Sequence, residues 1–168
     1  MGIVHLVFGP QGAGKSTYSR TLSESENGTR FSIDEWMVQL YGPDLPKPMN
    51  LSWIMERVRR CEAQIWSIAR AVALNGGSVI LDLGFMKATS RTEFAVLARE
   101  SGLEYRMHYL HAPHDVRRNR VLTRNAHKGV TFSLEVTPMM FDFMEKQFEP
   151  PSHMELSGVI TINTDVSA

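Results

Sequence analysis

The residues with the clearest chemistry lie near the start of the chain, in the segment Gly9-Pro10-Gln11-Gly12-Ala13-Gly14-Lys15-Ser16. This segment, called the P-loop below, satisfies the pattern GxxxxGK[ST] and lies between the apolar run 3–8 and a helical pattern that starts with Ser16 and Thr17. Glycines let backbone N–H groups surround a phosphate, and the positive end of the next helix faces the same charge. A chance glycine-rich turn would not require these flanks, so the context favours a nucleotide site. Lys15 is expected to reach the β- and γ-phosphates, and the Ser16 hydroxyl to bind Mg²⁺.

Two acidic residues each end an apolar, strand-like run and could act on that nucleotide. Asp34 follows 31–33, and Asp82 follows 79–81. Asp34 could accept the proton of a hydroxyl that attacks the γ-phosphate, or it could only cap the next helix, and its position alone does not separate these interpretations. For Asp82, a role in binding Mg²⁺ or substrate is favoured over that of a turn residue before Gly84.

Arginines form a third group. Helical spacing places Arg117, Arg120 and Arg124 along one side of a helix, where they could converge on a transferring phosphoryl group from a lid at about 117–135. The alternative is a basic face in contact with solvent. Arg91 starts another helix and is expected near the carboxyl edge of the sheet, where it could contact a phosphate or the substrate, or form a surface salt bridge.

The elements that must position these residues alternate along the chain. Strand-like runs occur at 3–8, 30–33, 79–83, 105–110 and 159–162, and helical patterns occur at 16–25, 51–75, 90–101 and 113–125. This alternation predicts an α/β fold with a parallel sheet of about five strands and helices on both faces. The length of 168 residues predicts a single domain over 1–168.

Composition narrows the possible partners. The 18 basic and 18 acidic side chains cancel, which disfavours a long nucleic acid, and the histidines match no zinc pattern. The single Cys61 cannot form an internal disulfide, and no run is long enough to span a membrane, so a cytoplasmic location is expected. Nothing in the sequence indicates an oligomeric state.

A candidate acceptor site follows Asp34. Its expected apolar lining is Trp36, Met37, Tyr41, Trp53 and Met55. Arg57 lies on a helix face that could reach the substrate or only contact solvent.

With the P-loop, Asp34, Asp82 and Arg120 to Arg124 in this order, the chain resembles the small P-loop kinases around chloramphenicol phosphotransferase, zeta-toxin kinases, gluconate kinase and polynucleotide kinase. It looks most similar to bacterial AAA-like ATP-binding kinases, whose Asp-x-Gly-Phe, Ser/Thr-Arg and Arg-x-x-x-Arg-Asn patterns are similar to 82–85, 90–91 and 120–125. The resemblance implies a three-layer, nucleoside-kinase-like fold with ATP and Mg²⁺ as donor. It also implies that Asp34 is the general base and that Arg120 and Arg124 belong to the lid.

The expectation is therefore an ATP- and Mg²⁺-dependent phosphotransferase that acts on a hydroxyl of a small molecule. The alternatives are a nucleotide-hydrolysing switch or ATPase subunit and a polynucleotide 5′-hydroxyl kinase. Met37 stands three residues after Asp34, where similar polynucleotide kinases carry an arginine, which disfavours a nucleic-acid acceptor.

Overall fold

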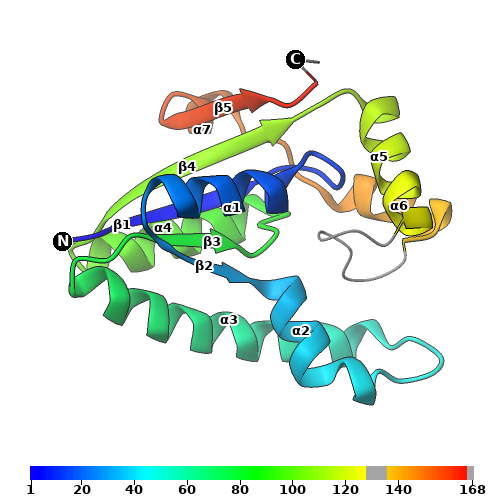
Figure 1. Cartoon of the computed structure of the whole chain (residues 1–168), viewed down its shortest axis with the longest axis horizontal. Helices are drawn as coiled ribbons and strands as arrows, with labels where there is room; N and C mark the ends of the chain where they lie inside the picture. Colours follow the sequence, from blue (N-terminus) through cyan, green and yellow to red (C-terminus); the bar gives the residue numbers. More distant parts are fainter. Residues whose placement is uncertain (128–135, 166–168) are drawn as a thin grey trace.

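The computed structural model describes residues 1–127 and 136–165. Within these residues the strands form one five-stranded sheet in the order β2-β3-β1-β4-β5, in which every neighbouring pair is parallel (Figure 1). The strands are β1 (Ile3–Phe8), β2 (Thr29–Ser32), β3 (Val79–Asp82), β4 (Glu104–His111) and β5 (Val159–Asn163). Parallel pairing brings the carboxyl ends of β1, β2 and β3 to one edge of the sheet, which we call the carboxyl edge.

Helices connect the strands. They are α1 (Lys15–Ser25), α2 (Ile33–Tyr41), α3 (Leu51–Leu74), α4 (Ala88–Glu100), α5 (His114–His127), α6 (Pro138–Gln147) and α7 (His153–Leu156), with a short 3-10 helix, η1 (Gly42–Asp44). Beyond the carboxyl edge, α2 and the start of α3 lie on one side, whereas α5 and α6 lie on the other (Figure 1). No helix in the described ranges has the length and apolar character needed to cross a membrane.

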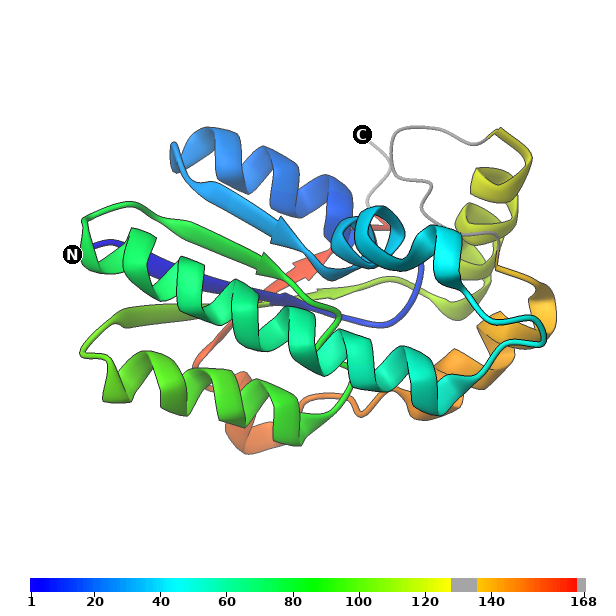
Figure 2. The same cartoon turned by 90° about the horizontal axis from the view of Figure 1, so that it is seen from below.

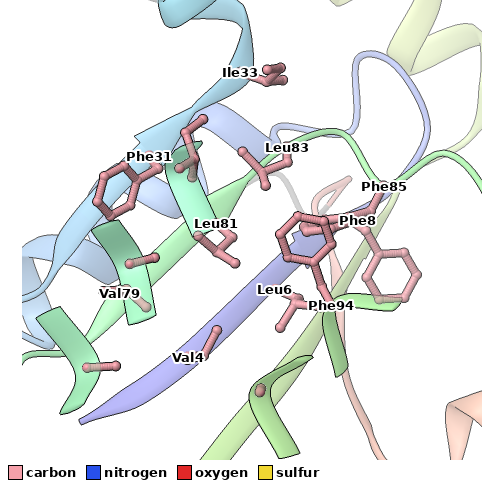
Figure 3. Packing of buried hydrophobic residues seen from close by; sticks show 14 of the residues in the cluster. Val4, Leu6, Phe8, Phe31, Ile33, Val79, Leu81, Leu83, Phe85 and Phe94 are labelled. Atoms are coloured by element: carbon pink, nitrogen blue, oxygen red, sulfur yellow. The ribbon is translucent and has the colours of Figure 1, made fainter. Parts of the chain in front are cut away.

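Successive side chains along each strand point to opposite faces of the sheet and form one hydrophobic core on each face. Val4, Leu6 and Phe8 of β1 pack in the larger core, to which α3 and α4 contribute (Figure 3). Val7 of β1 points to the other face and packs in a smaller core against Tyr18 of α1. Figure 2 shows α1 on one side of the sheet and α3 and α4 on the other. This confirms the α/β fold with helices on both faces.

The expected strands and helices are all present, with ends that differ by at most two residues. A lid was expected at about 117–135. Residues 117–127 form most of α5, and residues 128–135 lie outside the described residues.

A chain of polar rings lies buried between α1 and the sheet. His5 Nδ1 lies 3.0 Å from His108 Nε2, and His108 Nδ1 lies 2.8 Å from the Tyr18 hydroxyl. Both histidines are almost fully buried. Burial, together with the neighbouring charges of His5 and Arg106, lowers the pKa of His108 to about 4. The folded protein therefore holds this imidazole neutral at a pH where an exposed histidine is protonated.

Stability should consequently fall as the pH drops from 7 to 4. The unfolded state binds a proton at His108 near pH 6.5, whereas the folded state resists it until about pH 4. This difference corresponds to a loss of about 3 kcal/mol in the free energy of unfolding. Urea unfolding at several pH values should show a flatter dependence in His108→Gln than in the parent. His153→Gln, at an exposed position, serves as the control. Parallel pH curves for the parent and His108→Gln would contradict this account.

Candidate active site

The P-loop connects β1 to α1 in a conformation that its glycines permit. Gly9, Gly12 and Gly14 have φ angles of 154°, 77° and 89°, which L side chains rarely adopt. A Cβ atom at Gly9 would lie 2.2 Å from Leu110 O, so the backbone of β4 leaves room for glycine alone. Lys15, the first residue of α1, donates from Nζ to Gly9 O at 2.8 Å and to Pro10 O at 3.0 Å.

Two distant segments support the P-loop. Thr164, just after β5, donates from Oγ1 to Ala13 O at 2.9 Å. Arg120 of α5 donates to Thr164 O at 2.6 Å and Thr164 Oγ1 at 3.0 Å, and its Nη1 also approaches Gly12 O at 3.5 Å. Arg117 donates from Nη1 to Gln11 O at 3.1 Å. The loop therefore has a fixed shape supported by α5 and by the end of β5.

Gly12→Ala should abolish most nucleotide binding. A Cβ at Gly12 would lie 2.5 Å from Arg117 O, so the P-loop and α5 would have to separate. Gly76→Ala is a matched control, because Gly76 also has a positive φ, of 93°, but no atom lies within 4 Å of the added Cβ. Both variants carry the backbone cost of about 1 kcal/mol, and only Gly12→Ala adds the steric clash. Titration calorimetry with ATP measures the effect, and equal affinities in both variants would contradict it.

Asp34 lies in the first turn of α2, directly after β2. The N-cap of α2 is Ser32, whose side chain accepts from Glu35 N at 3.4 Å. The capping alternative considered for Asp34 is thus filled by Ser32, two residues earlier. Asp34 is exposed to solvent, although the surrounding protein atoms desolvate its carboxyl enough to raise its pKa.

Asp82 is the last residue of β3 and is buried at the carboxyl edge. Its Oδ2 accepts from Arg30 Nη2 at 2.7 Å and from the Ser19 hydroxyl at 3.1 Å. Asp82 Oδ1 accepts no hydrogen bond from the described residues. That oxygen therefore fits a Mg²⁺ ion or a Mg²⁺-bound water, the role expected for Asp82 together with Ser16 near the start of α1.

The charges of this site influence one another. Partial burial, and then the negative charge of Asp82, raises the pKa of Asp34, whereas Lys15, Arg124 and Arg30 act in the opposite direction. Burial lowers the pKa of Lys15, against the attraction of Asp82 and Asp34. The P-loop lysine, two carboxylates and two arginines therefore come together at the carboxyl edge.

The arginines of α5 do not converge as expected. Arg117 is buried and forms a bidentate pair with Glu145 of α6 at 2.6 Å, and Arg120 contacts the Thr164 region. Arg124 alone of the three influences the charges of both Lys15 and Asp34. Its Nε is buried and has no partner within the described ranges. The helical spacing was correct, but α5 packs with its first turns against α6 and the P-loop.

Arg91 differs most from expectation, because it is completely buried in the core rather than placed at the phosphates. It pairs with Glu155 of α7 at 2.9 Å, donates to Phe85 O and Glu149 O, and lies over the ring of Phe8. All of these partners are structural. Arg91 therefore joins α4, β1 and α7 within the core.

The residues expected to line an acceptor site form two groups. Trp36 and Met37, like Tyr41, are partly buried against the larger core. Tyr41 and Trp53 meet edge to face with ring centroids 6.1 Å apart, and the Arg57 guanidinium stacks 3.6 Å from the centre of the Trp53 ring. Met55 is exposed. We call Tyr41, Trp53 and Arg57 the aromatic cluster.

Sequence reasoning missed Arg30, Glu35, Ser19 and Thr164. Arg30 pairs in register with Ile80, two residues before Asp82, so the two side chains share a sheet face. In the sequence, Arg30 is recognisable as a basic residue within a predicted strand, four positions before Asp34. Its contact with Asp82 can be inferred only when β2 and β3 are known to be neighbours.

Comparison with known proteins agrees with this geometry. A family model described as an AAA domain, AAA_33, matches residues 4–151. A candidate kinase from Chloroflexus aurantiacus J-10-fl has 18% sequence identity and a TM-score of 0.75, over 97% of this chain and 85% of that chain. The Mycobacterium tuberculosis APS kinase CysC, in complex with AMPPNP and APS, has 15% identity and a TM-score of 0.64, over 99% of this chain and 90% of that chain.

A chain of the Pnkp1/Rnl/Hen1 RNA repair complex also matches, with 18% identity and a TM-score of 0.64, over 87% of this chain and 43% of that chain. At these identities the likeness concerns the fold, and it confirms the predicted resemblance to small P-loop kinases. No curated protein matches the sequence significantly.

Proposed function

We propose that this chain, which belongs to the AAA domain family AAA_33, is an ATP- and Mg²⁺-dependent phosphotransferase that moves the γ-phosphate to a hydroxyl of a small molecule. The observation that carries the proposal is the position of Asp34. It is not needed as a helix cap, it lies at the carboxyl edge, and it interacts electrostatically with Lys15, Asp82 and Arg124. A carboxylate so placed can accept the proton of an attacking hydroxyl.

The remaining residues divide the work of phosphoryl transfer. Lys15 and the P-loop amides hold the β- and γ-phosphates. Arg124, whose buried Nε has no partner among the residues that the structure describes, donates to the transferring group. Ser16 and Asp82 Oδ1 would hold Mg²⁺, which neutralises charge on the phosphate oxygens. Arg120 acts indirectly, because it supports the P-loop through Thr164. Positioning and charge neutralisation thus supply most of the catalysis.

The acceptor is a small polar or aromatic alcohol. Asp34 and the aromatic cluster belong to the consecutive elements α2 and α3, which lie together on one side of the carboxyl edge (Figure 1). A flat ring can pack on Tyr41 or Trp53, and Arg57 offers a cation beside them.

The test is turnover of ATP with a panel of hydroxylated compounds: sugars, sugar acids, nucleosides, aromatic alcohols and a 5′-hydroxyl oligonucleotide. ADP release is measured alongside phosphorylated product by mass spectrometry. We expect one small-molecule class to accelerate ADP release, with one phosphoester formed for each ADP. Hydrolysis that releases one inorganic phosphate per ADP, unaffected by any acceptor, would instead identify a nucleotide-hydrolysing subunit. Phosphorylation of the oligonucleotide alone would identify a polynucleotide kinase.

A further inference from the structure

One guanidinium at the carboxyl edge contacts three separate elements. Arg30 of β2 donates from Nε to Ser19 Oγ of α1 at 3.2 Å, and from Nη1 to Glu35 Oε1 of α2 at 2.8 Å. From Nη2 it donates to Asp82 Oδ2 of β3 at 2.7 Å. The Arg30 side chain is only 10% exposed, and the Asp82 side chain only 6%. All three nitrogens of the guanidinium are therefore used: the contact with Asp82 is buried, whereas the Glu35 side chain is 45% exposed.

The carboxylate of Asp82 depends mainly on this arginine for its orientation. The Ser19 hydroxyl has a single hydrogen, and its shortest contact is with Lys15 O at 2.7 Å, compared with 3.1 Å to Asp82 Oδ2. The charge-assisted bond from Arg30 is the shorter and stronger one. It fixes Oδ2 toward β2, and Oδ1 accepts no hydrogen bond from the described residues.

The same guanidinium also restrains the element that carries Asp34. Glu35 follows Asp34 in the first turn of α2, and its Oε1 accepts from Arg30 and, at 2.9 Å, from Arg20 of α1. Burial would raise the pKa of Glu35, but these two arginines outweigh it and hold the pKa below its ordinary value. Glu35 is therefore an ionised anchor that ties α2 to α1 and β2.

From this geometry we propose that Arg30 is a positioning residue for the proposed phosphotransfer: it aims Asp82 at the Mg²⁺–nucleotide and fixes the first turn of α2, which carries Asp34. The role toward Asp34 rests on the proposed function, whereas the role toward Asp82 does not. Planar, three-directional contact requires arginine, since a lysine ammonium keeps the charge but is a single point that cannot span the three partners in the same way.

The deciding experiment uses Arg30→Lys and Arg20→Lys. Both substitutions keep a positive charge and both alter a contact with Glu35 Oε1, and Arg30 in addition donates to Asp82 Oδ2. Calorimetry measures ADP affinity with Mg²⁺ and with EDTA, and the ratio of the two affinities is the Mg²⁺-dependent gain. We expect Arg30→Lys to reduce this gain by about tenfold, as for residues that orient a metal ligand. Arg20→Lys should keep it within about twofold.

Three results would overturn the inference: an unchanged gain in Arg30→Lys, an equal loss in both variants, or an equal loss of ADP affinity with and without Mg²⁺. Urea unfolding establishes that each variant folds. If Arg30→Lys fails to fold, Arg30→Gln replaces it and Arg20→Gln becomes its control, because each variant removes one guanidinium that contacts Glu35 Oε1. A loss of the gain in Arg30→Gln that Arg20→Gln does not share supports the inference, and an unchanged gain contradicts it.

The Mg²⁺-dependent gain in ADP affinity can also be measured whether or not the proposed function is correct. ADP affinity needs no acceptor, so a chain that phosphorylates nothing would refute the phosphotransferase proposal and leave the role of Arg30 toward Asp82 measurable. For the second half, Glu35→Gln should lower the turnover number with an identified acceptor and leave the Mg²⁺-dependent gain unchanged. An unchanged turnover number would contradict that half.

Discussion

Replacing Asp34 with asparagine should lower phosphoryl transfer by at least about a hundredfold while ATP still binds. Asparagine has nearly the shape of aspartate but cannot accept the proton of the attacking hydroxyl, and general-base catalysis contributes on this scale. The fold should tolerate the change, because Ser32 rather than Asp34 caps α2. The ionised form of Asp34 is disfavoured in the folded state, because burial and the negative charge of Asp82 raise its pKa. The measurement is product formation at saturating acceptor, together with ATP affinity by calorimetry.

Asp44→Asn is the matched control for this variant. Asp44 is an exposed residue of η1, so the same chemical change is made close to α2 but away from the carboxyl edge. Its rate should equal that of the parent. If Asp34→Asn transferred phosphate as fast as Asp44→Asn, Asp34 would not be the base.

Lys15→Ala should weaken ATP binding by about 10- to 100-fold, the range expected when a hydrogen bond to a charged group is lost. The same substitution should not destabilise the fold. Burial lowers the pKa of Lys15, which means that the folded state bears a cost for the charged form at neutral pH. The alanine variant should thus melt no lower than the parent even though it binds ATP poorly. Calorimetry and thermal unfolding measure the two effects.

Lys146→Ala provides the comparison, because Lys146 is exposed on α6. It should change neither ATP affinity nor the melting temperature. ATP affinity in Lys15→Ala equal to that of Lys146→Ala would be incompatible with the nucleotide site. A large fall in melting temperature for Lys15→Ala would instead indicate that its bonds to Gly9 O and Pro10 O outweigh the cost of its buried charge.

Local patterns in the sequence predicted much of this architecture. The strand ends at Phe8 and Asp82 were predicted within one residue, because apolar runs bounded by glycines specify buried strands without reference to other elements. The P-loop was equally accessible, since its glycines, lysine and serine are consecutive in sequence. The candidate positions of Asp34 and Asp82 follow from parallel strands ending at one edge.

Features that depend on packing between distant elements could not be predicted in the same way. Whether an arginine meets a phosphate or a glutamate of another helix depends on which helix it faces. The partners of Arg91 and Arg117 lie far along the chain, at Glu155 and Glu145. Arg30 required the strand order, because its partner Asp82 is 52 residues away. Charged side chains resemble one another in sequence whether they act on a ligand or hold the core together.

The bond from Thr164 to the P-loop also constrains the order in which this protein can become functional during synthesis. Ala13 leaves the ribosome early, yet the hydroxyl that holds its carbonyl lies 151 residues further along the chain. The flanking strand β1 is central in the sheet and needs β3 and β4 as neighbours before it is buried. A nascent chain therefore carries a complete phosphate-binding motif before the residue that supports the Ala13 carbonyl has been synthesised.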